Sequence, residues 1–298
     1  MPDTKPVDLT GHVPRGSTTD GGGCLFAFGL PFMAAGLGAA WAVHLDPSTA
    51  NVPLPAVYAF CGLFVLVGFG LSLHGIRTSV ARWRRARIRR QYPNDPWRAD
   101  YAWDPKGDRE RPIAKAINGL FGLAVFAIFL APFNVWMAND PNTVGVIILG
   151  IFDLLLVASI GFWLYDLGKG LKYGAGWVRY ERFPYFLGDR LDVRLGFRGR
   201  LDKFEKVIVT LRFIKERPQT SGKSQSVLCR QTWAEVLEFD PRVLRGATDL
   251  PVSIELPTGE YTTRLSEAPA QYWEIELHGV APGIDFQSRF LVPVYARG

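Results

Sequence analysis

The sequence predicts a membrane protein built in two parts, four transmembrane α-helices and an all-β C-terminal domain that folds as an antiparallel β-sandwich. Two charge-poor stretches, residues 24–74 and 117–165, alternate with densely charged ones. From Trp177 onward, apolar residues recur at every second position instead of in long runs. Long apolar runs are typical of membrane-spanning helices, and alternation is typical of half-buried strands. This division excludes a single soluble domain.

Four apolar runs are long enough to cross a bilayer, which requires about 20 mostly apolar residues. The expected spans are residues 24–44, 54–73, 117–137 and 143–164. In hydrocarbon every backbone polar group must be paired within its segment, so these runs must be helices. We therefore assign transmembrane helices 1 and 2 to residues 24–74 and helices 3 and 4 to residues 117–167. Residues 1–23, rich in Gly, Pro, Thr and Asp, are expected to form a disordered tail.

The connecting segments predict the orientation of these helices. Residues 45–53 and 138–142 contain no Lys or Arg, whereas residues 77–115 contain twelve, against five acidic residues. Lys and Arg accumulate in cytoplasmic loops of membrane proteins. We therefore expect both termini in the cytoplasm and residues 75–116 to form a basic cytoplasmic loop.

Seven arginines without a single acid follow the second span. They are Arg77, Arg82, Arg84, Arg85, Arg87, Arg89 and Arg90. We expect the second helix to continue past the membrane surface, so that these side chains contact anionic lipid headgroups. Each base near such a surface contributes about 1 kcal/mol. Binding of nucleic acid or of a specific phosphoinositide is the alternative, but a basic run beside a span is ordinary, and we expect no nucleic-acid partner.

Prolines at 93 and 96 end this helix, since proline lacks the backbone donor that a helix needs. Trp97, Tyr101 and Trp103 follow within a polar loop. Aromatic side chains in such a loop usually bury against another surface. We expect them to form a docking loop that contacts the headgroup layer or the C-terminal domain; a partner-binding loop is the alternative.

Residues 168–176 form a predicted glycine-rich joint, and residues 177–298 form the predicted cytoplasmic β-sandwich. Alternating rows begin near residues 191, 207, 252, 273 and 286, and residues 225–239 supply a less regular strand. Turn residues separate these rows, for example Pro257-Thr258-Gly259 and Pro282-Gly283. Seven or so short strands without helix signals are typical of an antiparallel sandwich.

Three short motifs carry a family resemblance. They are Tyr272–Leu277, with the sequence YWEIEL, the run VAPGIDF at 280–286, and the closing FLVPVY at 290–295. With Pro93, Pro96, Trp97 and the later Trp103-Asp104, they resemble a family of uncharacterised bacterial four-span inner-membrane proteins. The β domain is also similar to arrestin-like and immunoglobulin-like sandwiches. The resemblance implies a bacterial inner (cytoplasmic) membrane location and no known activity.

The sequence contains no catalytic, metal-binding or cofactor-binding motif. The four histidines at 12, 44, 74 and 278 are scattered, and no C-x-x-C, H-x-x-x-H, G-x-G-x-x-G or Walker pattern occurs. We therefore expect no catalytic residues, no metal and no cofactor, and we expect that the protein is not an enzyme.

Asp153 is the exception among the predicted spans. It lies about midway along the fourth span, where an ionised group costs roughly 2.5–3.5 kcal/mol. Such a residue either makes a hydrogen bond to another helix or lines a proton or ion pathway, and we favour the hydrogen bond.

The predicted function is therefore that of a membrane-tethered β-sandwich acting as an adaptor for an unidentified protein or peptide. An exposed sheet edge can accept an added strand, so binding requires no pocket. The alternative is a small transporter or channel subunit that uses Asp153. A membrane enzyme whose site the sequence does not reveal is the second alternative.

Overall fold

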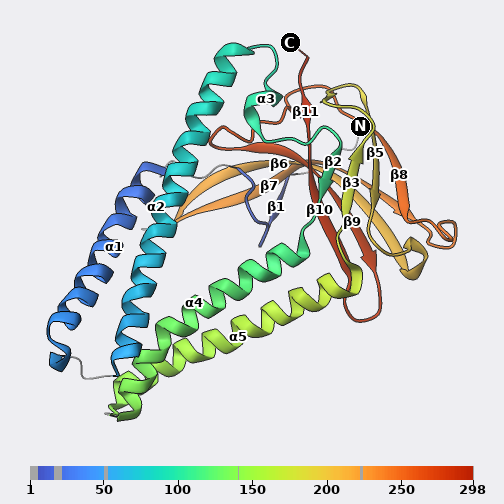
Figure 1. Cartoon of the computed structure of the whole chain (residues 1–298). Coiled ribbons are helices and arrows are strands. Elements are labelled where there is room, and N and C mark those ends of the chain that lie inside the picture. The colour runs from blue at the N-terminus through green and yellow to red at the C-terminus, as the bar shows by residue number, and fades with distance from the viewer. Residues whose placement is uncertain (1–5, 17–21, 50–52, 140, 222–223, 298) are drawn as a thin grey trace. The chain divides into compact units, whose positions relative to one another are not determined.

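A computed structural model describes residues 6–16, 22–49, 53–139, 141–221 and 224–297 (Figure 1). The chain divides into two compact units, each described separately below. Residues 19–83 and 112–168 form the helical unit. Residues 1–18, 84–111 and 169–298 form the β unit. Three separate stretches of sequence thus contribute to the β unit.

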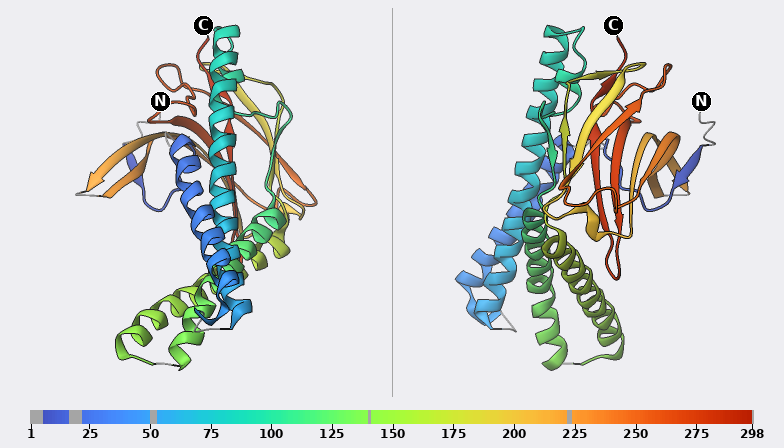
Figure 2. Two further views of the ribbon diagram at one scale, coloured as in Figure 1. Left: turned by 60° about the vertical axis from the view of Figure 1, so that its left-hand side comes forward. Right: turned by 90° about the vertical axis from the view of Figure 1, so that its right-hand side faces the viewer.

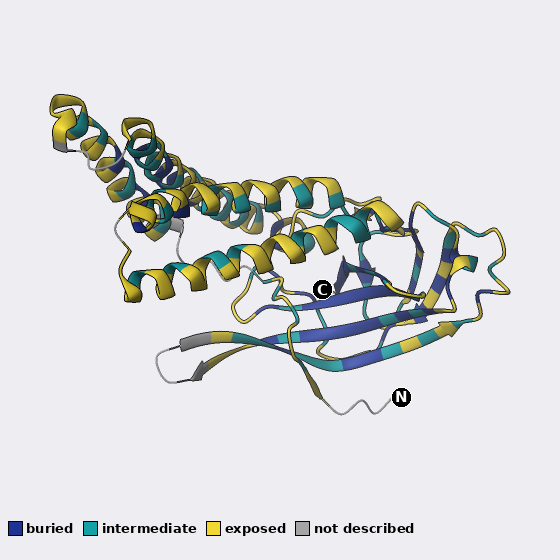
Figure 3. Ribbon diagram, turned by 90° about the horizontal axis from the view of Figure 1, so that it is seen from below, coloured by how far each residue is buried: buried dark blue, intermediate teal, exposed yellow. Residues whose placement is uncertain are grey.

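Four long helices dominate the helical unit. They are α1 (Gly22–Leu45), α2 (Leu54–Gln91), α4 (Pro112–Asn139) and α5 (Thr143–Tyr173). A short 3-10 turn, η1 (Pro47–Thr49), follows α1. All four helices are long and apolar enough to cross a membrane, which confirms the predicted membrane helices. Most of their large apolar side chains are exposed (Figure 3), as expected for surfaces that face lipid.

Polar contacts connect neighbouring helices within this unit. Ser72 Oγ of α2 donates a hydrogen bond to the carbonyl of Phe26 in α1, at 3.3 Å. Trp163 Nε1 of α5 donates to the carbonyl of Ala116 in α4, at 2.8 Å. Such contacts stabilise helix association in lipid, where the hydrophobic effect between helices is absent.

The predicted glycine-rich joint at residues 168–176 is mostly helical instead. Helix α5 runs through Gly168 and Gly170 to Tyr173. Glycine in a helix costs about 1 kcal/mol relative to alanine, but burial of Tyr173 offsets this cost. Its ring lies against Phe197, Phe204 and Phe286 of the β unit, and its hydroxyl donates to the carbonyl of Ile284.

The β unit is an antiparallel sandwich, as predicted. The five-stranded sheet has the order β1-β7-β6-β9-β10, the four-stranded sheet β2-β3-β5-β8, and a parallel pair β11-β4 completes the unit. The strands are β1 (Val7–Leu9), β2 (Gly107–Arg109), β3 (Trp177–Tyr180), β4 (Tyr185–Phe186), β5 (Arg190–Gly196), β6 (Lys206–Ser221), β7 (Ser224–Phe239), β8 (Asp249–Glu255), β9 (Gln271–Val280), β10 (Phe286–Val292) and β11 (Val294–Tyr295). A short 3-10 turn, η2 (Leu201–Lys203), precedes β6.

The core of the β unit consists of the inward-facing residues of both sheets. Trp273 of β9 is fully buried and contacts the rings of Phe213 and Trp233 at centroid distances of 5.3 and 5.0 Å. Its indole nitrogen donates to the carbonyl of Tyr261. Replacing such a residue with alanine typically costs about 3–5 kcal/mol.

The sandwich includes more of the chain than the predicted residues 177–298. Strand β1 from the predicted disordered tail pairs with β7, and β2 from the predicted basic loop pairs with β3 (Figure 2). A one-turn helix, α3 (Trp97–Asp100), also belongs to the β unit. Asp100 is buried, and it accepts hydrogen bonds from the Ser266 amide and the Tyr295 hydroxyl, at 2.7 and 3.0 Å. These contacts attach the loop to the sandwich.

Candidate functional site

The outer face of the five-stranded sheet, opposite the core, contains buried charged side chains. Alternation along β9 directs Trp273 and Ile275 into the core and Glu274 and Glu276 to the outer face. Arg212 of β6 is the register partner of Glu274. Its Nε donates to Glu274 Oε1 at 3.1 Å, and its Nη2 contacts Glu276 Oε2. The side chains therefore form an ion-pair ladder across the two strands.

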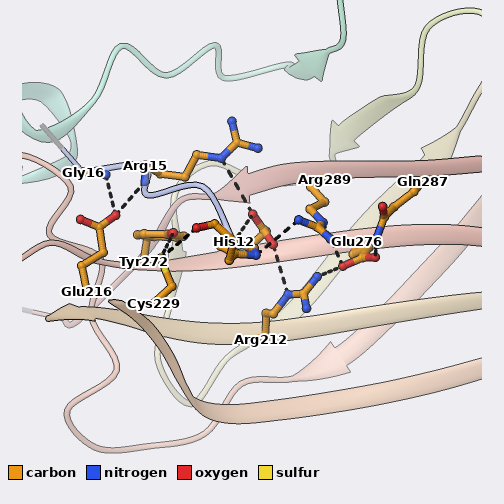
Figure 4. A network of polar contacts seen from close by, with 11 residues as sticks. His12, Arg15, Gly16, Arg212, Glu216, Cys229, Tyr272, Glu276, Gln287 and Arg289 are labelled. Atoms are coloured by element: carbon orange, nitrogen blue, oxygen red, sulfur yellow. Dashed lines mark hydrogen bonds and ion pairs between the residues drawn. The ribbon is translucent and has the colours of Figure 1, made fainter. Parts of the chain in front are cut away.

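This ladder continues onto β10 (Figure 4). Arg289 Nε lies 3.3 Å from Glu276 Oε2, and Gln287 donates a hydrogen bond to Glu276 Oε1. Glu274 is fully buried, and Arg212 and Glu276 are less than a tenth exposed. Charged groups are this deeply buried only when partners compensate them.

Residues 6–16, which we call the N-terminal strap, supply part of that cover. Val7, Asp8 and Leu9 of the strap form β1, opposite Gln231, Arg230 and Cys229 on the edge of β7. Arg230 Nε donates to Asp8 Oδ1 at 2.6 Å. Leu9 packs on a small apolar cluster on this face that includes Ile214, Tyr272 and Leu291.

The second half of the strap reaches the buried carboxylates. His12 Nε2 lies 3.4 Å from Glu274 Oε2, and the His12 side chain is only 5% exposed. Arg15 Nε lies 3.9 Å from the same oxygen. The backbone amides of Arg15 and Gly16 both donate to Glu216 Oε1, at 2.7 and 2.8 Å. Two carboxylates of the sheet thus hold one end of the strap.

Only glycine fits at position 16. A Cβ atom there would lie 2.3 Å from Ala270 Cβ and 2.6 Å from Glu216 Oε2. Atoms cannot approach so closely, and therefore any side chain at this position would displace the strap or its neighbours.

The side chains around Glu274 favour its ionised form. Burial alone would raise the pKa of Glu274, but His12, Arg212 and Arg15 outweigh burial and hold the pKa below its ordinary value. Burial lowers the pKa of Arg212, and Glu274 opposes that shift. The directions of these two pKa shifts support one arrangement, in which the buried carboxylate of Glu274 depends on cations from both the sheet and the strap.

A thiol and a phenol lie beside this charged ladder. Cys229 Sγ lies 3.9 Å from the carbonyl of His12 and 4.0 Å from the hydroxyl of Tyr272. Burial raises the pKa of both Cys229 and Tyr272. Both groups therefore stay protonated at neutral pH, and the thiol is not an activated nucleophile.

The sequence-based prediction of a disordered tail is wrong for residues 6–16. Composition indicated disorder because the strap is short and polar. Its order comes from pairing with β7 and from Glu216 and Glu274, which lie far away in the sequence. The alternation along β9 predicts that Glu274 and Glu276 point outward. It does not predict that the strap covers part of this face.

The predicted docking-loop residues lie against the β unit. Trp97 contacts the rings of Phe186 and Tyr295, both at a centroid distance of 6.0 Å. Trp103 Nε1 donates to the Tyr295 hydroxyl at 2.9 Å, and Tyr101 packs edge-to-face on Trp103. The structure thus brings these three aromatic residues together beside the C-terminal strand.

Asp153 lies on α5 opposite a polar side chain of α4. Asn134 Nδ2 donates to Asp153 Oδ1 at 3.1 Å and also to the carbonyl of Leu130 at 3.3 Å. Both Asp153 and Asn134 are half-buried. This contact gives the carboxyl group a partner on a neighbouring helix.

The seven predicted lipid-contacting arginines all lie on α2, which extends to Gln91. Five of them, Arg77, Arg84, Arg87, Arg89 and Arg90, are exposed, and Arg82 and Arg85 are half-buried. Arg89 Nη2 donates to Ser266 Oγ of the β unit at 2.9 Å. In the described part of the chain, no group of three His, Cys, Asp or Glu residues is arranged to hold a metal ion.

Comparison with protein-family models and with curated proteins finds no match. Among solved structures, the chain is similar to the sporulation control protein Spo0M from Bacillus subtilis, with 14% sequence identity and a TM-score of 0.27. That match covers 41% of this chain and 49% of Spo0M, so it spans about half of that protein's length.

Proposed function

We propose that the protein is a membrane-tethered adaptor whose β unit binds an extended peptide segment of a partner protein along the β7 edge. One observation carries the proposal: β1, a strand from the far end of the sequence, already occupies that edge. Strand addition to a sheet edge is a common mode of peptide recognition, in which backbone hydrogen bonds provide affinity. The N-terminal strap is then an internal occupant of the peptide site.

The strap is held loosely enough to be exchanged. Its backbone pairing with β7 extends over three residues, whereas β6 and β7 pair along almost their whole lengths. Val7 and Val13 of the strap are 50% and 69% exposed, so release of the strap would expose little additional apolar surface of these residues. Most of the specific attachment is polar, through Asp8, His12 and the Arg15 segment.

The contacts of the strap define the partner's chemistry. Release of the strap would leave Glu274 with Arg212 as its remaining cation, and buried charges that lose partners are strongly destabilising. A replacing peptide must therefore bring a cation to Glu274 and an acid to Arg230. We propose that the partner segment is extended and carries an acidic residue followed, at the spacing of Asp8 and His12, by a basic one.

Binding of a peptide supplied in trans tests this proposal. The full chain with Asp8→Ala, His12→Ala and Arg15→Ala weakens the strap, and a fluorescent peptide with the sequence of residues 6–16 is the probe. We expect saturable binding to this variant in detergent, at least about tenfold tighter than to wild type, whose own strap competes. A probe with the same three residues changed to alanine is the control and should bind more weakly. A folded variant that does not bind the probe would refute the proposal.

We further propose a bacterial inner-membrane location with both termini in the cytoplasm, so that the adaptor faces cytoplasmic proteins. The charge asymmetry of the loops supports this orientation. The arginines of α2 are proposed to contact anionic lipid headgroups, which would hold the membrane-proximal part of α2 at the surface. The proposed role requires no catalysis.

A further inference from the structure

A cavity of 690 Å³ lies within the β unit, between the segment 101–111 and β3. Pairing of β2 with β3 brings the two walls together. Gly107 makes this approach possible, because a Cβ there would lie 2.0 Å from the carbonyl oxygen of Val178. Its φ of +133° is also a conformation that other residues rarely adopt. The volume falls within the range of about 300–1,000 Å³ typical of small-molecule sites.

Basic side chains predominate in the lining of this cavity. They are Lys106, Arg109, Arg111, Arg179 and Arg198. Two acids also line it, and each accepts a hydrogen bond from its own loop: Asp104 Oδ1 accepts from the Lys106 amide at 2.9 Å, and Asp108 Oδ1 from the Arg109 amide at 2.7 Å. The lining therefore has an excess of positive charge.

None of these five bases forms an ion pair with any residue that the structure describes. Other arginines of the β unit are paired: Arg194 contacts Glu181 and Asp249, and Arg297 contacts Asp189. These five cations lack acidic partners among the described residues, so they would attract an anion into the cavity. Arg179 also lies over the Trp177 ring, at 5.6 Å from its centroid, which limits its side-chain freedom.

Along the chain, the residues that line the cavity directly adjoin two long apolar helices. Arg111 directly precedes Pro112, the first residue of α4, and the lining residue Ala175 comes two positions after Tyr173, the last residue of α5. Both walls of the cavity are thus within a few residues of helices long and apolar enough to cross a membrane.

We propose that this cavity binds a phosphate-bearing anion, either the headgroup of an anionic phospholipid or a soluble phosphate ester. Guanidinium groups match phosphate oxygens with two parallel hydrogen bonds, and four of the five bases are arginines. The aromatic rings of Tyr101, Trp103 and Trp177 provide an apolar wall for the organic part of the ligand. This site is separate from the peptide site on the five-stranded sheet, and neither proposal depends on the other.

Titration of the full chain with glycerol 3-phosphate tests the proposal. The protein is held in nanodiscs of uncharged phosphatidylcholine, and binding is followed by tryptophan fluorescence. We expect saturable binding that weakens at least tenfold in the double variant Arg179→Ala, Arg198→Ala. The matched control, Arg242→Ala with Arg245→Ala, removes the same charge from exposed positions that do not line this cavity, and should change affinity less than twofold. Equal losses in the two double variants would overturn the proposal.

A conservative variant and a change of lipid complete the test. If the alanine variant fails to fold, Arg179→Lys with Arg198→Lys keeps the charge but loses the paired hydrogen bonds, and an affinity loss of about threefold or more is expected. In nanodiscs containing 30% phosphatidylglycerol, a lipid ligand would occupy the cavity and weaken binding of glycerol 3-phosphate several-fold. Unchanged binding there would assign the site to a soluble ester. Two results together would overturn the proposal. Glycerol 3-phosphate would show no saturable binding in phosphatidylcholine, and its binding in nanodiscs containing phosphatidylglycerol would not differ between wild type and the Arg179, Arg198 double variants.

Discussion

His12 Nε2 and Glu274 Oε2, from opposite ends of the sequence, lie 3.4 Å apart beneath the surface of the β unit. The His12 side chain is 5% exposed and that of Glu274 is fully buried. This pair links the ordering of the N-terminal strap to the charge state of the five-stranded sheet.

Replacement of His12 by alanine should loosen the strap. Glu274 would lose its nearest contact from the strap and keep Arg212 and the more distant Arg15, so we expect a loss of about 1–2 kcal/mol, or a 5–30-fold higher population of the released strap. The rate of tryptic cleavage after Arg15, followed by mass spectrometry, measures this population. Val13→Ala changes an exposed neighbour and should leave the rate unchanged. An equal rate in His12→Ala and wild type would show that His12 does not hold the strap in place.

Replacement of Gly16 by alanine should release the end of the strap through a steric clash. The new methyl group would lie 2.3 Å from Ala270 Cβ. We expect the amides of Arg15 and Gly16, which donate to Glu216, to lose protection from hydrogen exchange by about tenfold. Removal of the opposing methyl group by Ala270→Gly in the same chain should restore part of that protection. Full protection in the single variant would show that the strap packs differently.

The attachment of the strap should weaken in acid. The pKa of Glu274 is lower in the folded protein than in an unfolded chain, so its contribution is complete above the unfolded value of about 4.3. That contribution is lost as the pH falls through the lower folded value. Tryptic cleavage is impractical there, so hydrogen exchange of the strap is measured between pH 3 and 6. Compared with Glu274→Gln, wild type should show an additional loss of protection below pH of about 4.3; identical pH profiles would exclude this role for Glu274.

Replacement of Asp153 distinguishes packing from transport. Asparagine keeps a hydrogen-bonding group opposite Asn134, so Asp153→Asn should leave stability in detergent nearly unchanged. Leucine removes the bond and should cost about 0.6–2 kcal/mol, measured as a lower midpoint of thermal unfolding. A folded Asp153→Asn protein that lost a proton or ion flux seen with wild type in proteoliposomes would instead favour the transporter.

The helices and most strands could be predicted because both follow from local patterns. The apolar run of α5 and the alternation of β9 are each visible within a single segment of sequence. The strap and β2 could not be predicted, because their order depends on partners remote in sequence, such as Arg230 and Arg179. The burial of Glu274 depends on the same remote contact. The cationic cavity could not be predicted either, because two separate segments line it, and each segment alone resembles an ordinary charged stretch.

Cross-linking of the strap to β7 tests whether the strap and the partner peptide share one site. Leu9 and Cys229 are register partners, so Leu9→Cys creates a cross-strand cysteine pair with one substitution. This change is made in the full chain carrying Asp8→Ala, His12→Ala and Arg15→Ala, and binding of the labelled peptide of residues 6–16 is measured. We predict that oxidation abolishes binding, that reduction restores it, and that adding Cys229→Ala removes the effect of oxidation. Undiminished binding to the fully oxidised protein would show that the strap and the peptide bind at different sites.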